Sequence, residues 1–390
     1  MQWGAEFFWL PHLLMDTQIV IIGGGLAGLV AALELVNADF DVLLIEKKGY
    51  PRHKVCGEYV SNEIRAYLEN LGLDLVKLGV KEISQLVLTS PTGFTLEAPL
   101  PMGGFGVSRF RLEDALYQLC VQAGVRFLLH TSVGEVINYS NQYFEVVTQS
   151  GERISTDKVI GAFGKKSGLD VKMGRAFVAA EAPYMAVKYH IRYDHPEDTI
   201  YLHNFKEGYC GMSAIEEGKS CLCYLTHRSN IRKAGGAISQ LEQTVLRRNP
   251  HLSKIFSEAE FLYEKPMVIS GFNFRKKKIV ENDILMVGDA AGLIPPLCGN
   301  GMAMAIDGAR LLAHQVIRNP KASVGEIANQ YQRQWNRSYS TRLRIGRSVQ
   351  ASFGREWVTD GLLRFFALSP SLTQKVIRLT HGDEVVSKIY

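Results

Sequence analysis

A glycine-rich segment near the start of the chain constrains the fold more than any other feature. The segment Gly23–Gly28 reads GGGLAG, follows an apolar stretch at 18–22, and precedes Ala and Leu residues at helical spacing. A second apolar stretch ends in Glu46, about twenty residues beyond the last glycine, where a carboxylate can accept hydrogen bonds from ribose hydroxyls. The pattern predicts a β-α-β unit that binds a dinucleotide.

Three glycines of this segment have separate roles. Gly23 permits a tight turn, Gly25 lets the backbone approach a pyrophosphate, and Gly28 lets the helix pack closely on the strand. The start of the helix also offers free N–H groups to phosphate oxygens. The residues that we expect to bind the cofactor here are Gly23, Gly25, Leu26, Ala27, Gly28, Glu46 and Lys47.

A second motif, GDAAGLIPPLCGNGM at 288–302, indicates which dinucleotide is bound. An NAD site does not need it, whereas the ribityl chain and isoalloxazine ring of FAD extend beyond the first unit and need further contacts. Asp289 can accept a hydrogen bond from a ribityl hydroxyl, and a helix that begins near Asn300 can direct its N-terminal dipole at the ring. The expected contacts are Gly288, Asp289, Gly299, Asn300, Gly301 and Met302. The sequence therefore predicts FAD.

Four segments together resemble the p-hydroxybenzoate-hydroxylase-type flavoproteins, and within them the geranylgeranyl-reductase-like branch. They are GGGLAG with its glutamate, PRHKVCGEYVS at 51–61, VSRFRLEDAL at 107–116, and the motif at 288–302. The resemblance implies an FAD domain assembled from discontinuous segments and a separate sheet domain over the substrate pocket.

The resemblance also implies individual contacts. Arg109 would face the cofactor, Val133 would contact adenine through its backbone, and the stretch 54–58 would lie near the isoalloxazine. One segment departs from the family pattern: 162–167 reads AFGKKS where relatives often have ADGxxS, so Phe163 replaces an aspartate. In hydroxylase relatives that motif is tied to both FAD and NAD(P)H binding. NAD(P)H as a transient electron donor and a redox partner protein as donor therefore both stay open.

The order of apolar stretches predicts an α/β fold in which a β-α-β fold is interrupted by an antiparallel sheet and closed by helices. The expected units are a discontinuous Rossmann-type FAD-binding domain (16–80, 105–170 and 270–325), an inserted β-sheet substrate domain (81–104 and 171–269) and a C-terminal helical region (326–390), with 1–15 as a leader outside the fold.

Candidate catalytic residues come from two segments that are expected to border the flavin, at 51–61 and 288–302. Cys56 and Cys298 would act as a redox pair or as a proton donor and its partner, because thiols can do both. Alternatively they are small, soft residues that pack against the ring. Candidate substrate-pocket residues are Glu58, Tyr209 and Met212. Glu58 could equally stabilise a helix start, and the other two could be sheet core.

Several other residues favour structural interpretations. Cys221 and Cys223 share one face of a strand, which indicates core packing, and two ligands do not make a metal site. His190, within a strand, is expected to be structural. The basic run at 275–278 is expected to be a solvated hairpin tip.

Composition limits the partners and the compartment. Net charge is +5 without long basic runs, so nucleic-acid binding is not expected. The six cysteines form no CxxC pair, which fits a reducing, cytoplasmic compartment. The basic, partly apolar tail at 331–390 could contact a membrane peripherally, or pack on the FAD domain with its basic face in water.

The function predicted from these features is that of an FAD-dependent oxidoreductase, a reductase or dehydrogenase acting on a hydrophobic isoprenoid, polyketide-derived or phenolic substrate. One alternative is an FAD-dependent monooxygenase or aromatic hydroxylase. Another is a non-catalytic isoprenoid-binding escort, a class that typically loses the flavin motifs which this chain retains.

Overall fold

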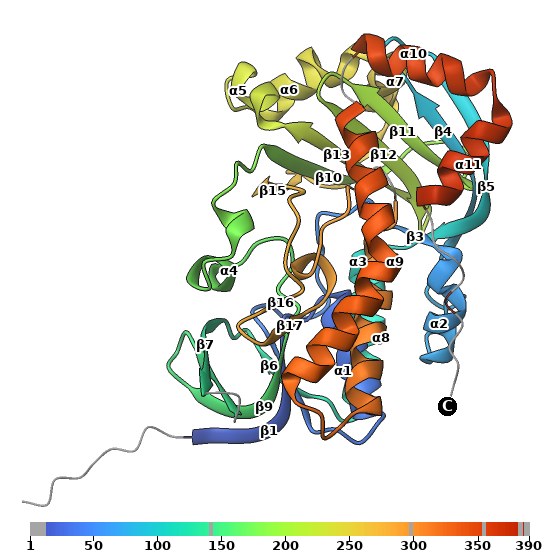
Figure 1. Cartoon of the computed structure of the whole chain (residues 1–390). Helices are drawn as coiled ribbons and strands as arrows, with labels where there is room; N and C mark the ends of the chain where they lie inside the picture. Colours follow the sequence, from blue (N-terminus) through green and yellow to red (C-terminus); the bar gives the residue numbers. More distant parts are fainter. Residues whose placement is uncertain (1–12, 140–142, 296–298, 353–355, 381–384, 386–390) are drawn as a thin grey trace, which may run out of the picture.

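Two β-sheets lie toward opposite ends of the molecule, with helices running between them along one side (Figure 1). The computed structural model describes residues 13–139, 143–295, 299–352, 356–380 and 385. Apolar residues of the first sheet and its helices form one large core, and the second sheet has an apolar cluster on each face.

The first sheet is parallel at its centre, with the strand order β16-β17-β9-β1-β2-β6. Its strands are β1 (Leu13–Ile22), β2 (Val42–Glu46), β6 (Arg126–Leu129), β9 (Arg153–Gly161), β16 (Val280–Glu281) and β17 (Ile284–Met286). A hairpin of β7 (Val133–Tyr139) and β8 (Tyr143–Thr148) pairs with β9. The central strands are covered on both faces, which explains why their sequences are apolar throughout rather than alternating.

Strand β1 begins earlier than the sequence indicates. Leu13 aligns with Arg153, and Met15 aligns with Ile154, in parallel pairing with β9. The expectation that 1–15 lies outside the fold is therefore wrong for the backbone of 13–15, because β9 extends far enough to offer hydrogen-bonding partners to those residues. The rest of the expected leader, 1–12, lies outside the described residues.

Three helices pack beside the parallel sheet: α1 (Leu26–Val36), α3 (Arg109–Gln122) and α8 (Gly301–Arg318). Helix α1 contacts both of the others, and its residues are almost all buried. Two shorter helices are α2 (Arg65–Asn70) and α4 (Gly168–Lys172). Single 3-10 turns occur at Asn62–Ile64, Ala176–Val178, Leu246–Arg248 and Gly288–Ala290.

The second sheet is largely antiparallel, with the order β14-β10-β13-β12-β11-β4-β5-β3, and β15 also pairs with β10. Its strands are β3 (Tyr59–Ser61), β4 (Lys81–Thr89), β5 (Thr95–Gly106), β10 (Tyr184–Arg192), β11 (Thr199–Phe205), β12 (Gly208–Ile215), β13 (Lys219–His227), β14 (Glu260–Phe261) and β15 (Met267–Phe272). Strand β3 belongs to this sheet by pairing with β5, although its residues fall within the range expected for the FAD domain.

The two faces of this sheet have different neighbours, because side chains alternate along each strand. On β10, Val187 and Ile191 pack in the cluster beneath α5 (Arg228–Lys233), α6 (Ile238–Thr244) and α7 (Pro250–Glu258). Ala186 packs in the opposite cluster. Lys188 and His190 share the face of Ala186, so two polar side chains are directed toward the side of the first sheet.

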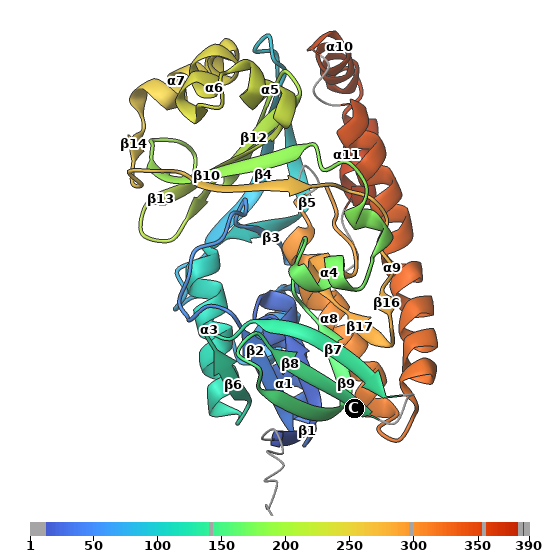
Figure 2. The same cartoon turned by 90° about the vertical axis from the view of Figure 1, so that its left-hand side faces the viewer.

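The C-terminal helices connect the two sheets. Helix α9 (Val324–Ser352) runs along the molecule from the parallel sheet to the antiparallel one, followed by α10 (Glu356–Ala367) and α11 (Pro370–Thr380) (Figure 2). The apolar face of α9 buries Tyr331, Trp335, Tyr339 and Leu343, residues spaced four apart. Among the described helices, none combines the length and apolar character that crossing a membrane requires.

Candidate cofactor and active site

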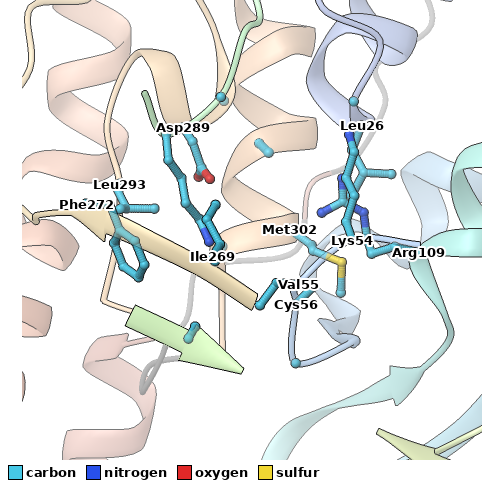
Figure 3. A pocket seen from close by; sticks show the side chains of 18 of the residues that line it. Leu26, Lys54, Val55, Cys56, Arg109, Ile269, Phe272, Asp289, Leu293 and Met302 are labelled. Atoms are coloured by element: carbon cyan, nitrogen blue, oxygen red, sulfur yellow. The ribbon is translucent and has the colours of Figure 1, made fainter. Parts of the chain in front are cut away.

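A cavity of about 770 Å³ lies between the two sheets and is lined by both. One end is formed by the glycine segment, Glu46 and Lys47. The other end is formed by apolar residues of the antiparallel sheet, including Leu202, Leu225 and Phe272. Figure 3 shows Leu26, Lys54 and Arg109 on one side of this space and Phe272 and Leu293 on the other.

The glycine segment has the geometry that its sequence predicts. Gly23 has φ +107°, a conformation that favours glycine. A Cβ on Gly28 would lie 1.9 Å from the carbonyl oxygen of Gly23, so no side chain fits there. A Cβ on Gly25 would instead meet only the ends of side chains, at 3.1 Å from Lys54 Nζ and 3.8 Å from Arg109 Nη2. Gly25 therefore faces the cavity beside two cations, at the N-terminus of α1, which fits a pyrophosphate.

Glu46 lies at the end of β2, where the dinucleotide motif requires it. Its carboxylate accepts hydrogen bonds from the backbone N–H groups of Gly24 at 2.7 Å and Lys48 at 3.0 Å. It also pairs with Arg52 at 3.1 Å. Each carboxylate oxygen has two lone pairs, so Glu46 can still accept from a ribose hydroxyl while it holds the loop. Val133 lines the same region of the cavity.

A charged cluster missed by sequence reasoning supports this end of the cavity. The Glu113 carboxylate on α3 is fully buried and pairs with Lys54 at 3.1 Å, Arg52 at 3.5 Å and the predicted cofactor residue Arg109. Burial lowers the pKa of Lys54 to about 8, although Glu113 opposes this. Burial also disfavours the charged form of Arg109, but Glu113 and then Cys56 outweigh it and raise its pKa. Glu113 could have been suspected from its i, i+4 spacing to Arg109.

The second motif meets the first across the cavity. Gly288, Asp289, Gly299, Gly301 and Met302 line the cavity, and Asn300 is buried at the start of α8. A Cβ on Gly288 would lie 2.9 Å from the Cβ of Ala27, so the two motifs pack directly. The expected catalytic residue Cys298 lies outside the described residues.

The basic run at 275–278 is not a solvated tip throughout. Lys277 is 5% exposed, and its Nζ donates hydrogen bonds to the carbonyl oxygens of Lys165 and Asp289, both at 2.7 Å. Burial lowers the pKa of Lys277 to about 8. The expectation fails here because nearby backbone carbonyls of the cofactor motif accept from this lysine, a contact that local charge patterning does not reveal.

Glu58 lies both at the cavity wall and at the start of α3. It lines the cavity, and it accepts the backbone N–H of Arg109, the first residue of α3, at 2.8 Å. It also forms a buried ion pair with Lys188 and a 2.6 Å hydrogen bond with His190. Burial raises the pKa of Glu58, but Lys188 and His190 outweigh burial and hold the pKa at about 2.

The antiparallel sheet holds the loop that carries Cys56. Lys188 Nζ donates to the carbonyl oxygen of Lys54 at 3.2 Å, and the Cys221 thiol donates to that of Cys56 at 3.2 Å. Glu58, His190 and Cys221 also place donor atoms within 4.8 Å of one another. The Lys188 ammonium already supplies the positive charge that a metal ion would bring to this carboxylate.

Cys223 lies differently from expectation, and Met212 and Tyr209 lie on opposite faces of β12. Cys223 was expected in the core, but it is only partly buried and lines the cavity. Met212 borders the cavity, yet alternation along β12 places its side chain in the cluster beneath α5–α7, so it belongs to the sheet core. Tyr209 packs in the cluster that faces the cavity and lines the cavity wall.

Comparisons with known proteins agree with this geometry. A family described as "FAD binding domain" matches residues 16–334. Digeranylgeranylglycerophospholipid reductase 2 of Methanopyrus kandleri is 25% identical over 393 residues, covering 95% of this chain and 94% of that protein. Menaquinone reductase of Mycolicibacterium smegmatis is 25% identical over 320 residues, covering 77% and 76%.

Solved structures show the same fold. The flavin-dependent brominase Bmp2 superposes with a TM-score of 0.78 at 19% identity and covers 94% of this chain and 93% of its own. A geranylgeranyl bacteriochlorophyll reductase-like protein from Thermoplasma acidophilum has a TM-score of 0.69 at 18% identity, with coverage of 95% and 93%. The cavity is lined by the glycine segment and by cations, and the family match extends over most of the chain. Both observations lead to one conclusion. The chain belongs to the FAD binding domain family and is an FAD-dependent oxidoreductase.

Proposed function

We propose that the chain is an FAD-dependent reductase or dehydrogenase whose substrate is hydrophobic, with isoprenoid compounds as the leading class and polyketide-derived or phenolic compounds as others. One observation carries the proposal: a single cavity extends from the glycine segment to an apolar wall of the antiparallel sheet. The names of the two curated relatives described above favour reduction, since one is a digeranylgeranylglycerophospholipid reductase and the other a menaquinone reductase.

The chain's own residues would position the reactants. The N-terminus of α1, Lys54 and Arg109 would neutralise the pyrophosphate, and Asp289 would accept from the ribityl chain. When bound, FAD supplies two-electron transfer to or from carbon. The apolar wall would exclude water and orient the substrate against the ring.

We propose Cys56 as the group that moves a proton in this cavity. It lines the cavity, as does Arg109, and its carbonyl oxygen accepts a hydrogen bond from the Cys221 thiol. Cys223 lines the same cavity, while Cys298, the partner that the sequence predicts for Cys56, stays a prediction.

The electron donor is proposed to be a redox partner protein, with NAD(P)H as the alternative. Phe163 lines the cavity in the segment where relatives often carry an aspartate, and its ring packs beside Gly161, where a Cβ would lie 2.7 Å from Phe163 Cε1. An aromatic ring offers no carboxylate to a nicotinamide nucleotide, which favours a protein donor.

An anaerobic titration of the FAD-loaded protein tests this function. NADPH is added first, then dithionite, while the visible flavin band is followed; the reduced protein is then mixed with menaquinone or geranylgeranyl diphosphate and the products are analysed. We expect reduction by dithionite but not NADPH, and a reduced product. An oxygenated phenol formed in air would support the monooxygenase alternative instead. A purified protein that takes up no FAD would support the escort.

We also propose peripheral contact with an anionic membrane through α10. Trp357, Phe365 and Leu368 are 80%, 55% and 85% exposed. Trp357 and Phe365 lie on one face of α10 with the exposed Arg364, and Leu368 directly follows the helix. Such a contact would bring a lipid-like substrate to the protein.

A further inference from the structure

Lys165 places a cationic side chain in the apolar half of the cavity. It follows β9, is half-buried, and lines the cavity. Its Nζ lies 5.0 Å from the centre of the Phe272 ring on β15. It also acts on the Cys223 thiol of β13: burial raises the pKa of that thiol to about 12, and the charge of Lys165 partly opposes the rise. The ammonium therefore lies by the antiparallel sheet rather than by the glycine segment.

The ammonium of Lys165 has an aromatic neighbour, the ring of Phe272. In the part of the chain that the structure describes, no carboxylate forms an ion pair with it. Lys54, the cavity lysine on the other side, pairs with Glu113 at 3.1 Å. A partly desolvated ammonium without a counter-charge is costly in free energy, and a bound anion would offset that cost.

The backbone of Lys165 is tied to the cofactor motif. The buried Lys277 donates to the carbonyl oxygens of both Lys165 and Asp289, each at 2.7 Å. This bridge fixes the base of the Lys165 side chain relative to the predicted ribityl contact. Burial lowers the pKa of Lys277, the carboxylates of Asp289 and Asp170 oppose this, and the charge of Lys165 adds a smaller lowering, so the two ammonium groups lie close enough to interact.

The apolar surroundings define the rest of the ligand. Leu202, Leu225 and Ile269 line the same part of the cavity, and Ile377 of α11 closes it. We propose that Lys165 binds an acidic oxygen group, a carboxylate or a phosphate, at the end of an otherwise hydrophobic substrate. This inference rests on the proposed function, and it narrows the substrate class to anionic amphiphiles.

Isothermal titration of the FAD-loaded protein with three matched probes tests the inference. The probes are dodecanoate, dodecyl phosphate and the neutral dodecanol, each below its micelle concentration. The variants are Lys165→Met, which keeps an apolar side chain and removes the charge, and Lys165→Arg, which keeps the charge. Lys172→Met removes an exposed lysine of α4 outside the cavity and serves as the control.

We expect Lys165→Met to weaken binding of at least one anionic probe by about tenfold or more, because it removes a hydrogen bond between two charged groups. Dodecanol binding and the Lys172→Met variant should be unchanged, and Lys165→Arg should retain anion binding. An effect on only one anionic probe identifies the group as carboxylate or phosphate. Equal weakening of all three probes, no weakening, or no binding of anionic probes by the wild type overturns the inference.

The visible spectrum of the same samples separates this inference from the proposed function. A protein that retains FAD and is reduced by dithionite, yet shows no Lys165-dependent anion binding, contradicts only the role of Lys165. A protein that reduces no substrate but still binds dodecanoate through Lys165 contradicts only the reductase proposal. Thermal unfolding of each variant checks that it is folded.

Discussion

Glu58 and Lys188 form an ion pair in which both side chains are fully shielded from solvent. Glu58 belongs to the loop that carries Cys56, and Lys188 belongs to β10 of the antiparallel sheet. Glu58 also accepts the first backbone N–H of α3 at 2.8 Å. The pair therefore joins the cofactor half of the molecule to the sheet that forms the substrate wall.

Removing the charge of Glu58 should destabilise the protein strongly. Glu58→Gln leaves the Lys188 ammonium buried without a counter-charge, which typically costs about 3–5 kcal/mol of unfolding free energy. Urea unfolding followed by circular dichroism measures the loss. The control is Glu82→Gln, an acid that is 67% exposed and pairs with Arg65 at 2.7 Å; its cost should be about 1 kcal/mol or less. Similar losses for both variants would contradict the prediction.

The contribution of Glu58 should vanish in acid. Its pKa is held at about 2 in the folded protein against an ordinary value of 4.5, so the folded state favours the carboxylate. Its stabilisation is therefore complete above about pH 4.5 and is lost as the pH falls toward 2. We expect the stability difference between wild type and Glu58→Gln to shrink from pH 5 to pH 3. A constant difference over that range would show that Glu58 does not titrate in this way.

FAD affinity should depend on the protonation of Lys54. Burial lowers the pKa of Lys54 to about 8, so the ammonium beside Gly25 loses its proton as the pH rises above that value. The stability of the FAD-free protein should change in the opposite direction. Because the pKa of Lys54 is lower in the folded state than its ordinary value of 10.5, the free energy of unfolding should rise between about pH 8 and pH 10.5.

The measurement for Lys54 is the dissociation constant of FAD, followed by flavin fluorescence from pH 7 to 9.5. We expect weaker binding at high pH in the wild type and a flatter profile in Lys54→Met. Lys172→Met, which changes an exposed lysine, should keep the wild-type profile. Identical profiles in all three proteins would exclude Lys54 as the titrating group.

Two glycines of the same segment should respond differently to alanine. A Cβ on Gly28 would collide with a backbone oxygen at 1.9 Å, so Gly28→Ala should unfold or severely destabilise the domain. A Cβ on Gly25 would meet the flexible end of Lys54, so Gly25→Ala should fold but bind FAD at least about tenfold more weakly. Gly325→Ala, with open space around it, is the control. Thermal unfolding and FAD titration together distinguish these outcomes.

The exposed face of α10 should govern vesicle binding. Trp357→Ser combined with Phe365→Ser removes aromatic side chains that are 80% and 55% exposed, so stability should change little. Sedimentation with phosphatidylglycerol vesicles should show reduced binding by this variant. Val76→Ser, at an 88% exposed apolar residue outside α10, is the control. Equal binding by wild type and both variants, or none by the wild type, would contradict membrane contact through this face.

The sequence by itself determined the cofactor-binding framework, because that framework depends on local backbone constraints. The tight turn at Gly23, the close packing at Gly28 and the carboxylate at the end of β2 follow from residue types at short spacings. The β-branched and aromatic residues in the middle of the chain likewise predict strands there. They do not predict which sheet a strand joins: β3 belongs to the second sheet because it pairs with β5.

Only the tertiary structure decided which side chains meet in the cavity. Lys188 reaches Glu58 and Lys277 reaches the carbonyl oxygen of Lys165 across more than a hundred positions of sequence. Alternation along a strand separates its two faces, but it does not show which face meets the cavity, so the sequence could not show that Cys223 lines the cavity or that the side chain of Met212 packs in the sheet core. The physical reason is that the environment of a buried charge or thiol consists of residues from other elements. The packing of the two sheets determines which residues those are.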